Sequence, residues 1–435
     1  MKNIVIAVCL LAAGLGLVAL GMSDGSFSVS KKAGETVSIP EPSESAVQKK
    51  TSVIDPTDPG LPDGYWDAPA ATDGNPPHDW SALEANLHPE ACAQCHIEQF
   101  NVWKNSLHAH AYSSGLIGQF PGMGHAAGNE CLECHAPLAE QLYPDSKEMF
   151  SSVQLSLQHS AGFDPDAVLD PESALPLRHS GVSCAACHVR GWKRFGPPSK
   201  KSGAVGFQDT VAHGGFTATK AFENSQFCAK CHQFPQSAAI NGKPLENTVF
   251  EWQQSDFARR GVSCQQCHMP DRRHEFRGIH DPEMVRKGLD ITLSRQQEGA
   301  VLAMTSKWIG HAFPTYVTPK VIVFAEAENQ DGNVIERWVW EIVREVEYSD
   351  GWQETQDTRL MPGETREFST GKMPAEAVSI RYKVAVIPDF FYKGVYKNLL
   401  AGNLTAVARQ HIQQAVSYAN DNDYLLYEQE LSLQP

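Results

Sequence analysis

Three regions of the chain differ in how apolar and polar positions are arranged. Residues 4–22 form a run of 19 positions without a charge. Residues 320–328, 334–346 and 378–387 are rich in β-branched side chains and partly alternate between apolar and polar, which is typical of strands with one buried face. Residues 401–419 place apolar side chains at helical spacing. The pattern therefore predicts an N-terminal apolar segment, a β-rich region and a C-terminal helix.

The β-rich region begins near residue 286. The segment Asn329–Gly332 is a hairpin signal between two of the predicted strands, and Pro362 with Gly363 marks a later turn. About seven short strands fit in this region, a number typical of two packed antiparallel sheets. We therefore expect a β-sandwich domain over residues 286–400, followed by a C-terminal helix and tail over residues 401–435.

The apolar run at the N-terminus allows two interpretations. Its length is close to the ~20 residues that span a bilayer and exceeds the core of a usual signal peptide, which favours an anchor. Ala19-Leu20-Gly21 also fits a cleavage site, so a removed signal peptide over residues 1–22 stays an alternative. Lys2 places the N-terminus in the cytoplasm by the positive-inside tendency. Either interpretation predicts a periplasmic or otherwise extracytoplasmic protein, in the first case anchored to the inner membrane by residues 4–22.

Residues 23–80 have the composition of a disordered linker. They contain eight Pro, five Gly and ten acidic against four basic residues, without apolar periodicity. Tyr65, Trp66 and Trp80, near the end of this segment, are expected to pack on the folded body. The formal net charge of the whole chain is -15. This charge argues against a nucleic-acid partner, because phosphate binding needs a basic surface.

Ten of the 11 cysteines belong to five copies of the pattern Cys-x-x-Cys-His. In this pattern two thiols form thioethers with a porphyrin and the histidine is the proximal iron ligand, which is the attachment chemistry of haem c. Paired Cys-x-x-Cys units also bind zinc, but five is an odd number of half-sites, and zinc does not require a histidine after every pair. The chain is therefore predicted to bind five covalently attached haem c groups. The motifs are Cys92/Cys95/His96, Cys131/Cys134/His135, Cys184/Cys187/His188, Cys228/Cys231/His232 and Cys264/Cys267/His268.

The motifs lie too close together for each haem to have its own core. Their first cysteines are 39, 53, 44 and 36 residues apart. We therefore expect the porphyrins to pack on one another in a mainly helical, loop-rich multihaem domain over residues 81–285, which makes the whole chain an α+β protein of two domains. Two pairs of similar segments indicate a duplicated unit. Gly181–His188 resembles Gly261–His268, and Val102–Ser106 resembles Glu251–Ser255.

The supply of a second axial histidine separates an electron carrier from a catalyst, because a second ligand closes the position where a small molecule would bind. Twelve of the 17 histidines remain after the five proximal ligands, which is enough to close every iron. For any one of them the alternative is a hydrogen-bonded histidine or one that contacts a haem propionate. The second motif is the candidate for an open haem. The candidate distal ligands are His108, His125, His179, His280 and His311.

Several of these segments resemble a known group of proteins. Cys92–Ala109, with Trp103, Ser106 and His108, resembles the CxxCHxxxYxxWxxSxHA opening of multihaem cytochromes c related to the tetrahaem electron acceptor of hydroxylamine oxidoreductase. Gly261–Met284 is similar to a recurring element of that superfamily. The segment from Gly310 to Thr315 is similar to the GHxFPT element that opens a β domain in some members.

The resemblance implies His108, His280 and His311 as distal ligands, and haems stacked in close pairs within an exported protein. The chain departs from the group in having five motifs rather than four or eight. It also has no CxxCK motif, so the lysine-ligated haem of pentahaem nitrite reductase is missing.

The sequence thus favours an electron carrier over a catalyst. The expected protein is an exported, membrane-tethered pentahaem cytochrome c that relays electrons between a respiratory donor and a downstream acceptor. Its expected partner is a redox protein or a quinol-oxidising complex. Two alternatives stay open: one open haem acts on a nitrogen or sulfur oxo-compound, or the chain is a docking subunit of a larger redox complex.

Overall fold

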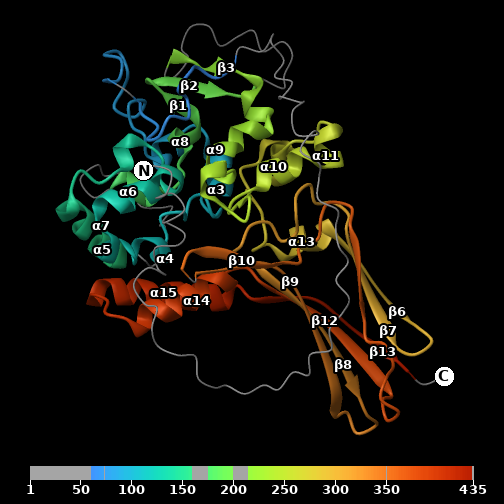
Figure 1. Ribbon diagram of the computed structural model, residues 1–435. Coiled ribbons are helices and arrows are strands. Elements are labelled where there is room, and N and C mark those ends of the chain that lie inside the picture. The colour runs from blue at the N-terminus through green and yellow to red at the C-terminus, as the bar shows by residue number, and fades with distance from the viewer. Residues whose placement is uncertain (1–59, 73, 159–174, 199–213, 349, 434–435) are drawn as a thin grey trace.

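The computed structural model describes residues 60–72, 74–158, 175–198, 214–348 and 350–433. A mainly helical region carries the haem motifs, and a β region extends away from it (Figure 1). The predicted N-terminal anchor or signal peptide lies outside the described residues. No helix of the described ranges has both the length and the apolar character needed to span a bilayer.

Short helices and long loops make up the motif region, as the close spacing of the motifs predicts. Four of the motifs lie at the ends of helices, because α6, α8, α9 and α12 each end at a proximal histidine. A helical turn places residues three apart on one side, so the two thiols of a motif face the same space. The helices are α2 (Pro89–Ala93), α3 (Ile97–Trp103), α4 (Ser114–Ile117), α5 (Phe120–Met123), α6 (His125–His135), α7 (Ser146–Gln158), α8 (Cys184–His188), α9 (Ala229–His232), α10 (Thr248–Gln253), α11 (Asp256–Arg259), α12 (Cys264–His268) and α13 (Pro282–Gly288).

Two small sheets accompany these helices. One joins β1 (Val189–Arg190), β2 (Lys193–Gly196) and β3 (Thr217–Ala218), and the other pairs β4 (Ala239–Ile240) with β5 (Lys243–Pro244). The first sheet begins directly after the third motif, whereas the second contacts the β region through the ion pair between Lys243 and Asp357.

Two larger antiparallel sheets form the β region. The first has the strand order β10-β9-β8-β12-β13 and the second has the order β11-β7-β6. Their strands are β6 (Leu289–Arg295), β7 (Ala300–Ser306), β8 (Lys320–Glu328), β9 (Val334–Tyr348), β10 (Trp352–Asp357), β11 (Thr365–Ser369), β12 (Ser379–Ile387) and β13 (Tyr424–Ser432).

Side chains from both larger sheets share one hydrophobic core. Leu302 and Met304 of β7 belong to the same buried cluster as Val323 of β8 and Val384 of β12. The buried hydroxyl of Tyr382 lies 2.9 Å from the carbonyl oxygens of both Ala300 and Phe368, so it also links the sheets by hydrogen bonding. The α+β class predicted from the sequence is confirmed.

The prediction for residues 401–435 needs correction. The predicted helix corresponds to α15 (Ala406–Asp421), but residues 424–432 form β13 and pair with β12 instead of forming a tail. The run Glu428–Glu430 hides this strand in the sequence, because an edge strand carries polar side chains that an interior strand does not. A second helix, α14 (Phe390–Ala401), was not predicted.

The two C-terminal helices return to the motif region, beneath α4 and α7 in Figure 1. His411 of α15 is fully buried, and its Nε2 donates to the carbonyl oxygen of Val153 in α7 at 2.8 Å. Gly115 of α4 lies so close to α14 that a Cβ at this position would overlap the Tyr396 hydroxyl. These helices therefore form part of the wall of the motif region.

The end of the predicted linker is folded onto the protein, so the prediction of disorder was wrong for residues 60–72. Tyr65 is buried, and its hydroxyl donates to the carbonyl oxygen of Cys187 at 2.6 Å. The guanidinium of Arg190 lies over the rings of Tyr65 and Trp66. Ala70 forms an isolated parallel β-bridge with Leu138. The aromatic side chains of this segment pack on the folded protein as expected. Their burial stabilises an ordered conformation, although the prolines and glycines of the segment suggest a flexible one.

Candidate haem-binding site

All five motifs line a single cavity of about 2550 Å³. Each motif contributes both of its cysteines and its histidine to the cavity wall. The volume is more than twice the upper end of the ~300–1,000 Å³ range of ordinary small-molecule pockets. A continuous space of this size, with thiol pairs and imidazoles on its wall, fits several large flat cofactors attached at the five motifs.

The cysteines show which motifs are neighbours. The thiols of Cys92 and Cys184 are close neighbours, which brings the first motif beside the third. Cys134 and Cys231 join the second motif to the fourth in the same way. A third contact, between the thiols of Cys228 and Cys264, joins the fourth motif to the fifth. Porphyrins attached at these cysteines would therefore lie next to one another.

Three proximal histidines are oriented by backbone carbonyl groups. The Nδ1 atoms of His135, His188 and His268 lie 3.0, 2.7 and 2.5 Å from the carbonyl oxygens of Ala111, Phe195 and Arg277, respectively. A metal-binding histidine commonly donates its second ring N–H to such a carbonyl, which fixes the ring and leaves the other nitrogen for the metal. Nε2 would thus be the atom available to bind an iron in these three rings.

The fourth proximal histidine has a carboxylate as its neighbour instead. His232 Nδ1 lies 4.0 Å from Glu246 Oε1. Burial raises the pKa of Glu246 to about 7. This motif therefore has a different polar environment from those whose histidines contact backbone carbonyl groups.

Three proximal histidines each face a second histidine across the cavity. The ring centres are 6.3 Å apart for His232 and His108 and 6.2 Å apart for His188 and His274. They are 6.3 Å apart for His268 and His311, whose planes are nearly parallel at 12°.

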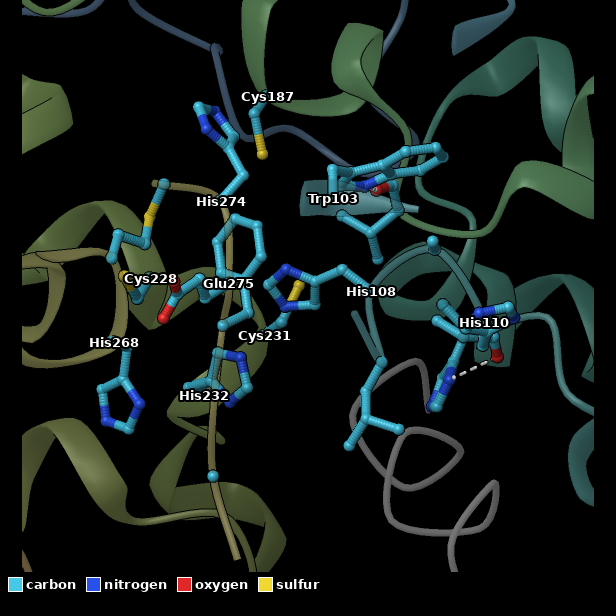
Figure 2. Close-up of a pocket in the computed structure, with 18 of the residues that line it drawn as sticks. Trp103, His108, His110, Cys187, Cys228, Cys231, His232, His268, His274 and Glu275 are labelled. Carbon is cyan, nitrogen blue, oxygen red and sulfur yellow. Dashed lines mark hydrogen bonds between the residues drawn. The ribbon is translucent and has the colours of Figure 1, made fainter. Parts of the chain in front are cut away.

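These distances match the geometry of one iron between two imidazoles. A metal–nitrogen distance of about 2.0 Å on each side, with about 1.2 Å from each nitrogen to its ring centre, gives about 6.4 Å between ring centres. Direct ring stacking would be closer. The three pairs therefore fit two axial histidines at the third, fourth and fifth motifs. Figure 2 shows His108 pointing toward the space beside His232, whereas the ring of His274 points the other way, toward Cys187 of the third motif.

Burial keeps these rings neutral. It lowers the pKa of His108 to about 3, and those of His268 and His274 to about 4. Neutral imidazole is the form that binds a metal. The protein thus presents the paired histidines in the protonation state that iron ligation requires.

The other three candidate distal ligands are placed differently. His125 does not line the cavity, and its Nδ1 contacts the Ser146 hydroxyl at 2.9 Å. His179 lines the cavity, but its two ring nitrogens are hydrogen-bonded to Ser152 and Ser156. His280 also lines the cavity, and its Nε2 lies 3.1 Å from the Asp389 carboxylate. The structure therefore brings together His108 and His311 with proximal histidines, but not His125, His179 or His280.

His274 was not among the predicted ligands. It follows the fifth motif by six residues, yet it faces His188 of the third motif. Its position after a motif was a signal in the sequence, but His280 shares that signal. Only the fold distinguishes the two. His88 and His110 also line the cavity, although neither was a predicted ligand.

The motifs, the common cavity and the paired imidazoles define a multihaem c-type cytochrome. The model of the family described as cytochrome c554 and c-prime matches residues 91–154, which include the first two motifs. The chain is also similar in fold to the penta-heme cytochrome c552 from Thermochromatium tepidum. That likeness has a TM-score of 0.54 at 19% identity and covers 81% of this chain and 100% of the other. No curated protein sequence matches the chain significantly.

Proposed function

We propose that this multihaem cytochrome carries five haems and acts as an electron relay between a respiratory donor and a downstream acceptor. The observation that carries the proposal is the shared cavity, in which every motif lies beside another and three irons would have two histidine ligands. Each haem would supply a ferric/ferrous couple when bound. The likeness to a penta-heme cytochrome supports the count of five.

The residues around the motifs favour electron transfer through their ligation of the irons, their orientation of the rings and their spacing of the haems. Two axial histidines close an iron to small molecules and favour electron transfer over catalysis. Backbone carbonyl groups hold three of the proximal rings in place, so little rearrangement would accompany a change of charge there. The neighbouring thiols place adjacent porphyrins in reach of one another along the cavity. These features favour a continuous electron-transfer path through the motif region.

The haem count and the ligation state are the decisive measurements. We expect five haems per chain from the ratio of haem absorbance to protein mass, with the mass of the intact chain raised by five haem groups. The ferric EPR spectrum is expected to show at least three low-spin haems with two histidine ligands. Fewer than five attached haems would contradict the count, and a spectrum made up of high-spin haems would contradict the relay.

We further propose that residues 4–22 tether the protein to the membrane outside the cytoplasm, where it meets a redox protein or a quinol-oxidising complex. The support is the uncharged run at the N-terminus, followed by a segment rich in Pro and Gly. The full chain is expected to stay with the membrane fraction after a high-salt wash. A chain in which residues 1–22 are replaced by a cleavable signal peptide is expected in the soluble fraction. Release of both forms would contradict the tether.

A second candidate function rests on the second motif. Among the described residues, no second imidazole faces His135 at a distance comparable to the three pairs. An open iron there would bind a small nitrogen or sulfur oxo-compound. A high-spin ferric signal that changes on addition of cyanide or nitrite is expected in that case. Five low-spin haems whose EPR signals do not change on addition of cyanide or nitrite would contradict this function.

A further inference from the structure

The loop that carries His311 comes from the β region, but the motif region holds it. Gly310 packs against α10 and α11, where a Cβ would lie 3.2 Å from Trp252 Cδ1 and 3.4 Å from Phe257 Cβ. Ala312 is fully buried. His311 Nδ1 donates to the carbonyl oxygen of Ala312 at 2.9 Å, so the orientation of its ring follows the backbone of the loop.

Glu251 of α10 connects this loop to the rest of the β region. Its Oε2 accepts a hydrogen bond from the backbone N–H of Ala312 at 3.2 Å. Its Oε1 accepts one from the Arg359 guanidinium at 2.9 Å. The Glu251 and Arg359 side chains are only 6% and 4% exposed, so both charges are removed from solvent.

Arg359 in turn is fixed on the β side. Asp357 contacts its Nε at 2.8 Å. The next residue, Leu360, exchanges two backbone hydrogen bonds of 2.8 Å with Phe313, two residues beyond His311. One buried carboxylate therefore holds the His311 loop directly through Ala312 and indirectly through the segment at Arg359.

We propose that Glu251, held by Arg359, is a positioning residue that places the His311 ring opposite His268 and so closes the iron at the fifth motif. The inference rests on the proposed function in that a haem is attached at this motif. Without the carboxylate, the Ala312 amide loses its acceptor and Arg359 keeps only Asp357 as a charged partner. A buried backbone N–H without an acceptor is unfavourable, so the loop is expected to shift. The sixth ligand of this haem thus depends on how the β region docks on α10.

Substitutions at Glu251 test this role. In Glu251→Ala we expect all five haems to remain attached, because both thiols and the proximal histidine of the fifth motif are unchanged. One low-spin ferric EPR signal is expected to be lost and replaced by a high-spin signal, the same change that His311→Ala produces. Glu251→Gln retains an oxygen that accepts from Ala312, and it is expected to keep the low-spin signal.

Glu251→Asp is the second test, which is needed if the alanine variant does not fold and acquire its haems. It keeps the charge but shortens the side chain by one methylene, so it cannot reach both Ala312 and Arg359. It is expected to show a fraction of the same high-spin signal, which Glu251→Gln does not show.

A matched control lies at the same interface. Arg344 is fully buried, pairs with Glu354 at 2.7 Å and donates to the carbonyl oxygen of Pro244 at 2.6 Å, away from the His311 loop. Glu354→Ala disrupts a comparable buried pair and is expected to leave every low-spin signal unchanged.

Three results would overturn the inference. Low-spin signals that are unchanged from the unsubstituted protein in both Glu251→Ala and Glu251→Asp would show that the carboxylate does not position His311. The same high-spin signal in Glu354→Ala would show that any damage to the interface is enough. An unchanged spectrum in His311→Ala would show that His311 is not the ligand. Failure of the proposed function is distinguishable, because it appears as a wrong haem count in the unsubstituted protein.

Discussion

The indole nitrogen of Trp252 donates a hydrogen bond to the carbonyl oxygen of Val262 at 2.8 Å. Trp103 makes the same contact with Val182, at 3.0 Å. Both valines stand two residues before the first cysteine of a motif, the third motif for Val182 and the fifth for Val262. The similarity between these segments therefore extends to the way the chain is held. Each copy uses one tryptophan to fix the backbone just ahead of a haem-attachment turn.

The two copies differ at the residue five positions after the tryptophan. In the first copy this residue is His108, and in the second it is Phe257. Both accept a hydrogen bond from the valine N–H at 2.9 Å through their carbonyl oxygens. His108 faces the fourth motif, whereas Phe257 packs beside Gly310 and supports the loop of His311. The second copy thus supports a ligand that comes from the β region.

The tryptophan contacts are expected to contribute to stability. Trp103→Phe removes the N–H and leaves the Val182 carbonyl oxygen without its donor, which costs about 1–3 kcal/mol for a buried group. Denaturant unfolding should show this decrease in the free energy of unfolding. Trp252→Phe is expected to cost less, because that side chain is only partly buried. Trp308, which is 53% exposed, supplies the control. A decrease as large in Trp308→Phe would contradict the explanation.

The paired histidines predict the outcome of single substitutions. His108→Ala and His274→Ala should each convert one low-spin haem to a high-spin haem while leaving the number of attached haems unchanged, because only the distal ligand is lost. Ferric EPR and the optical spectrum check this. His125→Ala is the control, since His125 lies outside the cavity. An altered spin state in His125→Ala, or none in the other two variants, would refute the assignment.

The attachment chemistry could be predicted because each motif contains both cysteines and the histidine within five consecutive residues. The pairing of the irons with distal histidines could not, because it depends on contacts between distant segments. His274 and His280 lie six residues apart after the same motif, yet one faces His188 and the other contacts Asp389. The sequence pattern located β8, β9 and β12 through their apolar faces. It missed β13, whose polar side chains conceal its pairing with β12.

The return of the C-terminal helices to the motif region can be tested at a glycine. Gly115→Ala places a Cβ against the Tyr396 hydroxyl and 3.3 Å from Ala415 Cβ, so α4 has to move away from α14 and α15. Overpacking of this kind costs about 1–3 kcal/mol. Thermal unfolding should show a lower midpoint. Gly122→Ala is the control, because no atom lies within 4 Å of its added Cβ. Equal effects of the two substitutions would contradict the packing argument.

The contact between the motif region and the β region is expected to weaken in acid. Lys243 of β5 contacts the Asp357 carboxylate at 2.6 Å, and Arg359 contacts it at 2.8 Å. Burial acts to raise the pKa of Asp357, but the hydrogen bonds and charges of Arg359 and Lys243 outweigh it and hold this pKa below its usual value. The folded state therefore binds fewer protons than the unfolded state in acid, and stability falls as the pH decreases below about 4.

Asp357→Asn is expected to remove this dependence. At pH 7 the substitution should lower the free energy of unfolding by about 1–3 kcal/mol, because two buried or partly buried cations each lose one of their carboxylate partners. The difference from the unsubstituted protein should persist down to about pH 4 and shrink toward zero below it, as the carboxylate takes up a proton. Denaturant unfolding between pH 2 and 7 measures both curves. Parallel curves over the whole range would show that the charge of Asp357 does not stabilise this interface.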